Sequence, residues 1–205
     1  MRGLTWKMSK EKMGGFRFLR SILSPLFKLW YNPTIIGKEN IPESGAIIVA
    51  GNHKHLMDQC MIIISTKRPI HYMAKCEYWK GPFAWFFNIA GCIPVDRDKK
   101  DKAAVDSALE VLKNGQALGI FPEGTRNRTE ELLLPFKFGC VSMAHKTDAL
   151  IVPFGIYGDY KFRSRNLVIR IGKPFKADDD LEKANEKLVS EVTKLIKESA
   201  SKNGK

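Results

Sequence analysis

The chain has 205 residues, 44% of them hydrophobic, which predicts one compact domain with a full core. It carries 34 basic and 22 acidic side chains, and the net charge of +12 indicates an anionic partner surface. The longest charge-free stretch, residues 81–95, contains two prolines and is too short for a membrane-spanning helix of about 20 residues. The four cysteines are widely spaced without a C-x-x-C pair, which disfavours disulfides and indicates structural thiols in a reducing cytosol.

The first predicted element is an amphipathic helix over residues 16–30. Apolar side chains recur there at steps of three and four residues: Phe16, Leu19, Leu23, Leu26, Phe27 and Trp30. Pro25 predicts a kink or a break in this helix. Residues 1–38 contain eight basic side chains and one acidic side chain, a net charge of +7. This excess favours a helix lying in an anionic membrane surface over one docked on the domain's own core, and predicts a membrane-associating segment at residues 1–32.

Beyond that segment, short β-rich runs alternate with helical stretches. The predicted strands cover residues 34–37, 46–50, 71–74, 92–95, 117–121, 151–156 and 167–171. The predicted helices cover residues 57–66, 82–90, 100–114, 138–147 and 181–200. This alternation predicts one α/β domain over residues 33–205, with a largely parallel mixed sheet of about seven strands flanked by helices.

Three candidate site residues follow predicted strands. His53 comes after the strand at 46–50, Arg97 after the strand at 92–95, and Glu123 after the strand at 117–121. Ligands bind beyond the carboxyl ends of the strands in such sheets. We therefore expect these three side chains along the same edge of the sheet.

The segment N-H-K-H-L-M-D at residues 52–58 places an imidazole, His53, five positions before a carboxylate, Asp58. Histidine titrates near neutral pH, as a general base must, and an aspartate bound to Nδ1 would leave Nε2 free to accept a proton. The chain has no G-x-S-x-G motif and no cysteine near a matching base in sequence. The nucleophile is therefore expected to be the substrate's own hydroxyl group. Taken alone, the pattern also fits a loop histidine that packs or caps.

A metal site is the competing interpretation of this segment. His53, His55 and Asp58 faintly resemble the H-x-H-x-D-H motif of metallo-hydrolases, but Asp58 comes one position late and no histidine follows it. Only His71 and His145 remain elsewhere in the chain, so we expect no bound metal.

The segment F-P-E-G-T-R at residues 121–126 predicts an anion-binding turn. Gly124 lets backbone N–H groups approach phosphate oxygens, and Arg126 offers a bidentate guanidinium. Arg97 could supply a second guanidinium to the same phosphate, or form only a surface ion pair with a neighbouring aspartate. Lys137 could add positive potential at this edge, although solvated lysines are commoner.

Four sequence blocks, in family order along the chain, resemble the glycerolipid acyltransferase family and specifically its 1-acylglycerol-3-phosphate acyltransferases (lysophosphatidic acid acyltransferases). The blocks are N-H-x4-D at residues 52–58, G-C-I-P-V-D-R at 91–97, F-P-E-G-T-R at 121–126 and I-V-P-F at 151–154. The family often has serine two positions after the catalytic histidine, where this chain has His55. Protonated, His55 would add positive charge beside the site.

The resemblance implies transfer of an acyl group from acyl-CoA or acyl carrier protein to the sn-2 hydroxyl of lysophosphatidate. The product would be phosphatidate, and residues 33–205 would form the acyltransferase domain. By the same resemblance His53 is the base and Asp58 its partner, with Pro153 on the acyl-donor side. The residues implied to hold the glycerol phosphate are Arg97, Glu123, Gly124, Thr125 and Arg126.

The expected partners are anionic membrane lipid, lysophosphatidate and the acyl donor, with no cofactor and no nucleic acid. The expected location is the cytoplasmic face of the cell membrane, as a monotopic or peripheral protein of phospholipid biosynthesis. Two alternatives remain open. One is an acyltransferase for another acceptor, such as glycerol 3-phosphate or another lysolipid. The other is a non-catalytic binder of anionic membranes or nucleic acid, which would explain the charge of +12 but neither cluster of candidate residues.

Overall fold

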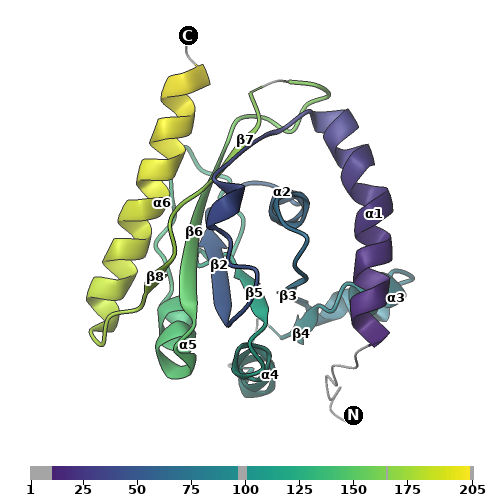
Figure 1. Ribbon diagram of the computed structural model, residues 1–205, viewed down its shortest axis with the longest axis vertical. Coiled ribbons are helices and arrows are strands. Elements are labelled where there is room, and N and C mark those ends of the chain that lie inside the picture. The colour runs from purple at the N-terminus through teal and green to yellow at the C-terminus, as the bar shows by residue number, and fades with distance from the viewer. Residues whose placement is uncertain (1–10, 97–100, 165, 204–205) are drawn as a thin grey trace.

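The apolar, β-rich runs of the sequence form the strands of one mixed sheet, and the stretches between them form helices (Figure 1). The computed structural model describes residues 11–96, 101–164 and 166–203. The helices are α1 (Glu11–Tyr31), α2 (Asp58–Ser65), α3 (Ala84–Ile89), α4 (Lys102–Lys113), α5 (Gly139–Thr147) and α6 (Leu181–Asn203). The strands are β1 (Thr34–Ile36), β2 (Ile47–Gly51), β3 (Ile70–Lys75), β4 (Ile93–Val95), β5 (Ala117–Ile120), β6 (Leu150–Tyr157), β7 (Val168–Ile171) and β8 (Phe175–Lys176). Two short 3-10 helices are η1 (Lys38–Asn40) and η2 (Cys76–Lys80).

The strand order is β1-β7-β6-β2-β5-β3-β4, and β8 pairs with β6. Strands β6, β2, β5, β3 and β4 are parallel to one another, whereas β7 and β8 run antiparallel to β6. Near the carboxyl end of β2, Ala50 pairs with Ile120 of β5 on one side and with Pro153 of β6 on the other. The chain segments that follow β2 and β5 therefore emerge side by side.

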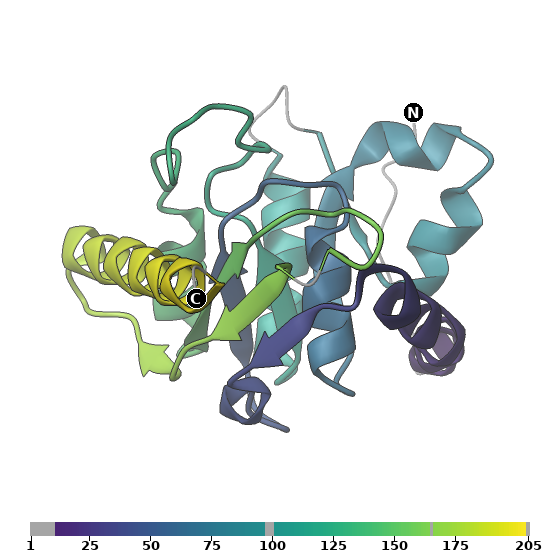
Figure 2. The same cartoon turned by 90° about the horizontal axis from the view of Figure 1, so that it is seen from above.

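Helices cover both faces of the sheet (Figures 1 and 2). Successive side chains of a strand point to opposite faces, and β2 divides its apolar residues accordingly. Ile48 and Ala50 pack with side chains of α4, α5 and α6, whereas Ile47 and Val49 pack with side chains of α2. Helix α1 lies outside α2, where it contacts α2 and α3. All five positions of β2 are buried, which explains its continuous apolar run.

The predicted fold class is confirmed. Each of the seven predicted strands and each predicted helix has a counterpart in the structure. Sequence reasoning missed β8, because its two residues, Phe175 and Lys176, are too few to show an alternating pattern. The sheet is mixed because β7 returns antiparallel to β6 after a short connection.

Pro25 was predicted to cause a kink or a break in the N-terminal helix, and the break is absent, since α1 is one helix of 21 residues that continues through Pro25. Proline removes the N–H that would bond to the carbonyl four residues earlier, at Ser21. Both Ser21 and Pro25 are exposed, so water can satisfy that carbonyl.

Helix α1 buries one side on the domain and exposes an apolar stripe on the other. Phe16 and Ser24 are buried, Phe27 is half-buried, and the Nε of Arg20 donates to the Ile63 carbonyl at 3.1 Å. The outward side chains are 46–66% exposed: Phe18, Ile22, Leu23, Leu26, Leu29 and Trp30. The helix thus docks on its own domain and still presents apolar surface. Within the part of the chain that the structure describes, no helix is long and apolar enough to span a bilayer.

Candidate active site

His53 lies in the turn between β2 and α2, beyond the carboxyl end of β2. Its Nδ1 is 2.8 Å from Oδ2 of Asp58, the first residue of α2. The Asp58 side chain is fully buried, and the His53 side chain is 14% exposed. With the proton on Nδ1 donated to Asp58, Nε2 of the neutral imidazole is an acceptor. The structure brings the two predicted partners into contact, and their catalytic role stays a prediction.

The Asp58 carboxylate is held by four hydrogen-bond donors. Besides His53, the backbone N–H groups of Lys54 and His55 donate to Oδ2 at 2.7 and 2.8 Å. The hydroxyl of Tyr160 donates to Oδ1 at 2.6 Å. An anion at the first residue of a helix is also favoured by the helix dipole. These donors compensate for the burial of the charge, so Asp58 can serve as a fixed acceptor for the imidazole.

Aromatic packing fixes the other side of the imidazole. The ring of Phe121, at the end of β5, stacks on His53 with the centroids 4.0 Å apart and an interplanar angle of 17°. Phe121 in turn meets Phe154 of β6 edge to face at 6.0 Å. The imidazole is therefore held by a hydrogen bond at Nδ1 and by a ring face, which leaves Nε2 as the acceptor.

Glu123 is buried and its two carboxylate oxygens accept backbone hydrogen bonds. Oε1 accepts from the N–H of His53 at 2.6 Å, and Oε2 accepts from the N–H of Leu134 at 2.9 Å. The N–H of Asn127 donates back to the His53 carbonyl at 2.6 Å. Burial raises the pKa of Glu123, while the two hydrogen bonds act in the opposite direction. Glu123 thus ties the turn after β5 to the turn that carries His53, and its predicted contact with a phosphate stays a prediction.

The turn after β5 presents two cations at the surface. Gly124 has a φ of 72°, and a Cβ built there would lie 2.7 Å from Nζ of Lys137, so the Lys137 amine lies over the glycine. Thr125 is exposed and Arg126 is half-buried. Among residues 11–96, 101–164 and 166–203, neither the Arg126 guanidinium nor the Lys137 amine has a hydrogen-bond or ion-pair partner. Both cations are therefore available to an anion beside the His53 turn.

Arg97 and Pro153 are the remaining predicted site residues. Arg97 lies outside the described residues. Pro153 is buried inside β6, opposite Ala50 of β2, and its carbonyl accepts from the N–H of Gly172 at 2.8 Å. Its predicted place on the acyl-donor side stays a prediction.

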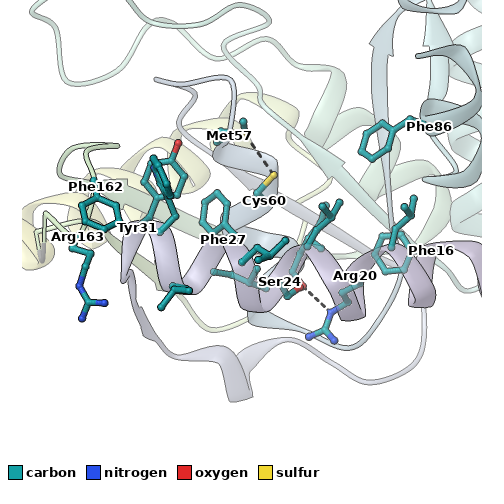
Figure 3. A pocket seen from close by; sticks show the side chains of 17 residues that line it. Phe16, Arg20, Ser24, Phe27, Tyr31, Met57, Cys60, Phe86, Phe162 and Arg163 are labelled. Atoms are coloured by element: carbon teal, nitrogen blue, oxygen red, sulfur yellow. Dashed lines mark hydrogen bonds between the residues drawn. The ribbon is translucent and has the colours of Figure 1, made fainter. Parts of the chain in front are cut away.

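An apolar pocket of about 910 Å³ lies between α1 and α2 (Figure 3). Phe27 and Tyr31 of α1 line it, together with Met57 and Cys60 at the start of α2. The ring of Tyr31 meets the ring of Tyr160 edge to face at 5.6 Å, so the pocket adjoins the residue that bonds to Asp58. A pocket with so apolar a lining suits a hydrocarbon chain.

Sequence reasoning missed Tyr160 as a partner of the His53–Asp58 dyad. It lies 102 residues beyond Asp58, in the connection between β6 and β7, and no local motif marks it. The sequence marks Asn52 only as the first residue of the N-H-x4-D block. Its side-chain amide bonds to both the carbonyl and the N–H of Ile156, at 2.9 and 2.7 Å, and so ties the end of β2 to β6.

This α/β fold, with a histidine–aspartate pair beyond the central strand, matches a known class of protein. The family model described as Acyltransferase matches residues 32–157, and the chain belongs to that family. The resemblance inferred from the four blocks is thereby confirmed.

The relatives carry a more particular name. The chain is 36% identical over 141 residues to a 1-acyl-sn-glycerol-3-phosphate acyltransferase of Borreliella burgdorferi, covering 67% of this chain and 56% of that protein. It is 27% identical over 170 residues to the Bacillus subtilis protein of the same name, covering 80% of this chain and 84% of that one. The crystal structure of the 1-acyl-sn-glycerophosphate (LPA) acyltransferase PlsC from Thermotoga maritima has the same fold. Its TM-score is 0.78 at 24% identity, and the match covers 95% of this chain and 84% of that chain.

Proposed function

We propose that this protein transfers an acyl group from acyl-CoA or acyl carrier protein to the sn-2 hydroxyl of 1-acylglycerol 3-phosphate, giving phosphatidate for phospholipid biosynthesis. One observation carries the proposal. A histidine with its Nδ1 bound to a buried carboxylate lies in a turn that is hydrogen-bonded to the turn bearing Arg126. A base beside an anion site is the arrangement that acyl transfer to a phosphorylated alcohol requires. The names of the relatives at 36% and 27% identity support the choice of acceptor.

In the proposed reaction Nε2 of His53 removes the proton of the acceptor hydroxyl. The oxygen attacks the thioester carbonyl, and the tetrahedral intermediate collapses to an ester with loss of the thiolate. The imidazolium then returns its proton to the leaving sulfur, so the base is regenerated. Asp58 stabilises the imidazolium between these two steps. Backbone N–H groups would stabilise the oxyanion.

The phosphate of the acceptor is proposed to bind at the turn after β5. Arg126 and Lys137 would neutralise it, and the backbone at Gly124 and Thr125 would approach its oxygens. Arg97 is proposed as a further guanidinium for the same phosphate. Glu123 would act through its hydrogen bonds to His53 and Leu134, which hold this turn against the base.

The outer stripe of α1 is proposed to lie in an anionic membrane at its cytoplasmic face. Its large apolar side chains are exposed, and Arg17 and Lys28 are exposed on the same helix. The apolar pocket between α1 and α2 would accept the acyl chain of the acceptor or of the donor, because it lies between the proposed membrane side and the dyad. In this proposal residues 1–32 associate with lipid and residues 33–205 form the catalytic domain.

An acceptor panel tests the proposal. The purified protein is given labelled acyl-CoA or acyl carrier protein in anionic liposomes, with lysophosphatidate, glycerol 3-phosphate or lysophosphatidylcholine as acceptor. Labelled phosphatidate from lysophosphatidate alone is the expected result. Faster acylation of glycerol 3-phosphate would overturn the assignment of the acceptor, and no transfer to any acceptor would overturn the reaction. Activity should survive chelators, since no step uses a metal.

A further inference from the structure

The connection between β6 and β7 brings Tyr160 to the dyad. Three of the four donors to Asp58 bond to Oδ2: Nδ1 of His53 and the N–H groups of Lys54 and His55. The other oxygen, Oδ1, has a single partner among the described residues, the Tyr160 hydroxyl at 2.6 Å. A hydrogen bond to a carboxylate of this length is among the stronger ones in proteins. Without it, Oδ1 would be a fully buried charged oxygen with no donor.

The Tyr160 hydroxyl is protonated and donates its hydrogen bond to Asp58. Burial raises the pKa of Tyr160 far above its usual value, and the Asp58 carboxylate raises it further. The hydroxyl therefore keeps its proton throughout the pH range in which an enzyme works, and its O–H points at Oδ1.

The ring of Tyr160 is held between two other aromatic rings. It stacks on the imidazole of His55, with the centroids 4.2 Å apart and an interplanar angle of 19°. It also meets Tyr31, the last residue of α1, edge to face at 5.6 Å. His55, where the family often has serine, thus packs against Tyr160. Its Nδ1 is 3.2 Å from the N–H of Met57, which donates to it.

The connection that carries Tyr160 is fastened on both sides of it. Before Tyr160, the carbonyl of Gly158 accepts from Nζ of Lys54 at 2.5 Å. After it, the N–H of Arg163 donates to the Trp30 carbonyl at 2.8 Å, and Phe162 meets the Trp30 ring edge to face at 4.9 Å. These contacts hold in place the segment that positions the Tyr160 hydroxyl against Asp58.

We propose that Tyr160 is a positioning residue for the dyad, which holds Oδ1 of Asp58 so that Oδ2 stays on Nδ1 of His53. Its hydroxyl bonds to Asp58, so it acts on the imidazole through that carboxylate. The kinetic consequence rests on the proposed function, whereas the consequence for the tautomer of His53 does not. Without Tyr160, Oδ2 of Asp58 is free to leave Nδ1, so more of the neutral imidazole should carry its proton on Nε2.

The variant Tyr160→Phe removes the hydroxyl and keeps the ring contacts with His55 and Tyr31. We expect kcat to fall about tenfold with KM for acceptor and donor unchanged, because the defect lies in the orientation of the base. The matched control is Tyr157→Phe, a hydroxyl removed from β6 with no hydrogen-bond partner among the described residues, which should keep wild-type kinetics. Thermal unfolding of both variants checks that they are folded.

A second readout is independent of catalysis. The ring nitrogens of His53 are followed by nitrogen NMR, at a pH where the imidazole is neutral, in the wild type and in Tyr160→Phe, with His53→Gln used to assign the signals. A larger share of the tautomer with the proton on Nε2 in Tyr160→Phe supports the positioning role. An unchanged share, or an equal change in Tyr157→Phe, overturns it. If the wild type transfers no acyl group, the proposed function fails, and this measurement still decides the role of Tyr160.

Discussion

The turn that carries the dyad and the outer stripe of α1 are held in opposite ways. In the turn, the buried carboxylates of Asp58 and Glu123 accept six hydrogen bonds between them, four and two respectively. Along α1, large side chains such as Phe18 and Leu29 are about two-thirds exposed at 66% and 65%. The first region is specified by directional contacts that tolerate little displacement. The second region presents only exposed apolar area, which can bind a fluid lipid surface without directional contacts.

This difference predicts where each substitution acts. A change in the turn should alter the rate of the chemical step or the binding of a phosphorylated substrate, with little effect on lipid binding. A change on the outer stripe of α1 should alter lipid binding and leave the chemical step intact. Each variant below is therefore measured for both kcat in detergent and affinity for anionic liposomes.

The largest effect among these variants is expected from Asp58→Asn. An asparagine is neutral, so it would no longer stabilise the positive charge that His53 gains when it removes the proton. We expect kcat to fall about 10²-fold or more, with liposome binding unchanged. An unchanged kcat and pH–rate profile would show that the dyad does not act as a base.

Next is Glu123→Ala, which leaves the N–H groups of His53 and Leu134 without their acceptor. Each buried N–H left unpaired costs about 1–3 kcal/mol, so the unfolding temperature should fall. Turnover should fall about tenfold, because the turn that carries His53 loses one of the hydrogen bonds that tie it to the turn after β5. Glu130→Ala, an exposed carboxylate of the same connection, is the control. Equal losses in both variants would contradict the role given to Glu123.

A third variant, Arg126→Ala, removes a guanidinium that has no partner in the described residues. KM for the phosphorylated acceptor should rise about tenfold, as expected for loss of one charge-assisted contact, with kcat nearly unchanged. Arg128→Ala, an exposed arginine two positions on, should leave KM as it is. A rise in KM for the acyl donor with none for the acceptor would assign Arg126 to the other substrate.

The smallest effect on chemistry should come from the double variant Phe18→Ser, Leu29→Ser on α1. Loss of this apolar area should weaken binding to anionic liposomes about tenfold and leave kcat in detergent unchanged. Val105→Ser is the control, since Val105 is 39% exposed on α4, on the other side of the sheet. If the double variant binds liposomes as well as the wild type, α1 is not the lipid-binding element.

The sequence predicted most of what depends on local pattern. The apolar run of β2, the turn after it and the spacing of His53 and Asp58 are all local, and they specified the strand and the pair of candidate residues. The contacts of Tyr160 and Lys137 could not be predicted, because the residues they touch in the fold lie far away in the sequence. Lys137 was considered only as added charge, yet it lies over Gly124.

Burial was also hard to infer. The family resemblance implies that Glu123 helps to hold the phosphate, and nothing in the sequence shows that its carboxylate is buried. The structure gives both its oxygens backbone partners, Leu134 and His53. For α1, the periodic pattern gave an apolar face but not which neighbours would cover it. The helix buries Phe16 and leaves Leu26 57% exposed, although both belong to the predicted face.

The most direct test of the central claim is phosphatidate formation by the wild type and by His53→Ala, measured side by side with labelled acyl donor and lysophosphatidate in anionic liposomes. We expect phosphatidate from the wild type and a rate at least 10²–10⁴-fold lower from the variant, with equal liposome binding and unfolding temperature. Near wild-type transfer by His53→Ala would contradict the assignment of His53 as the base and, with it, the proposed mechanism.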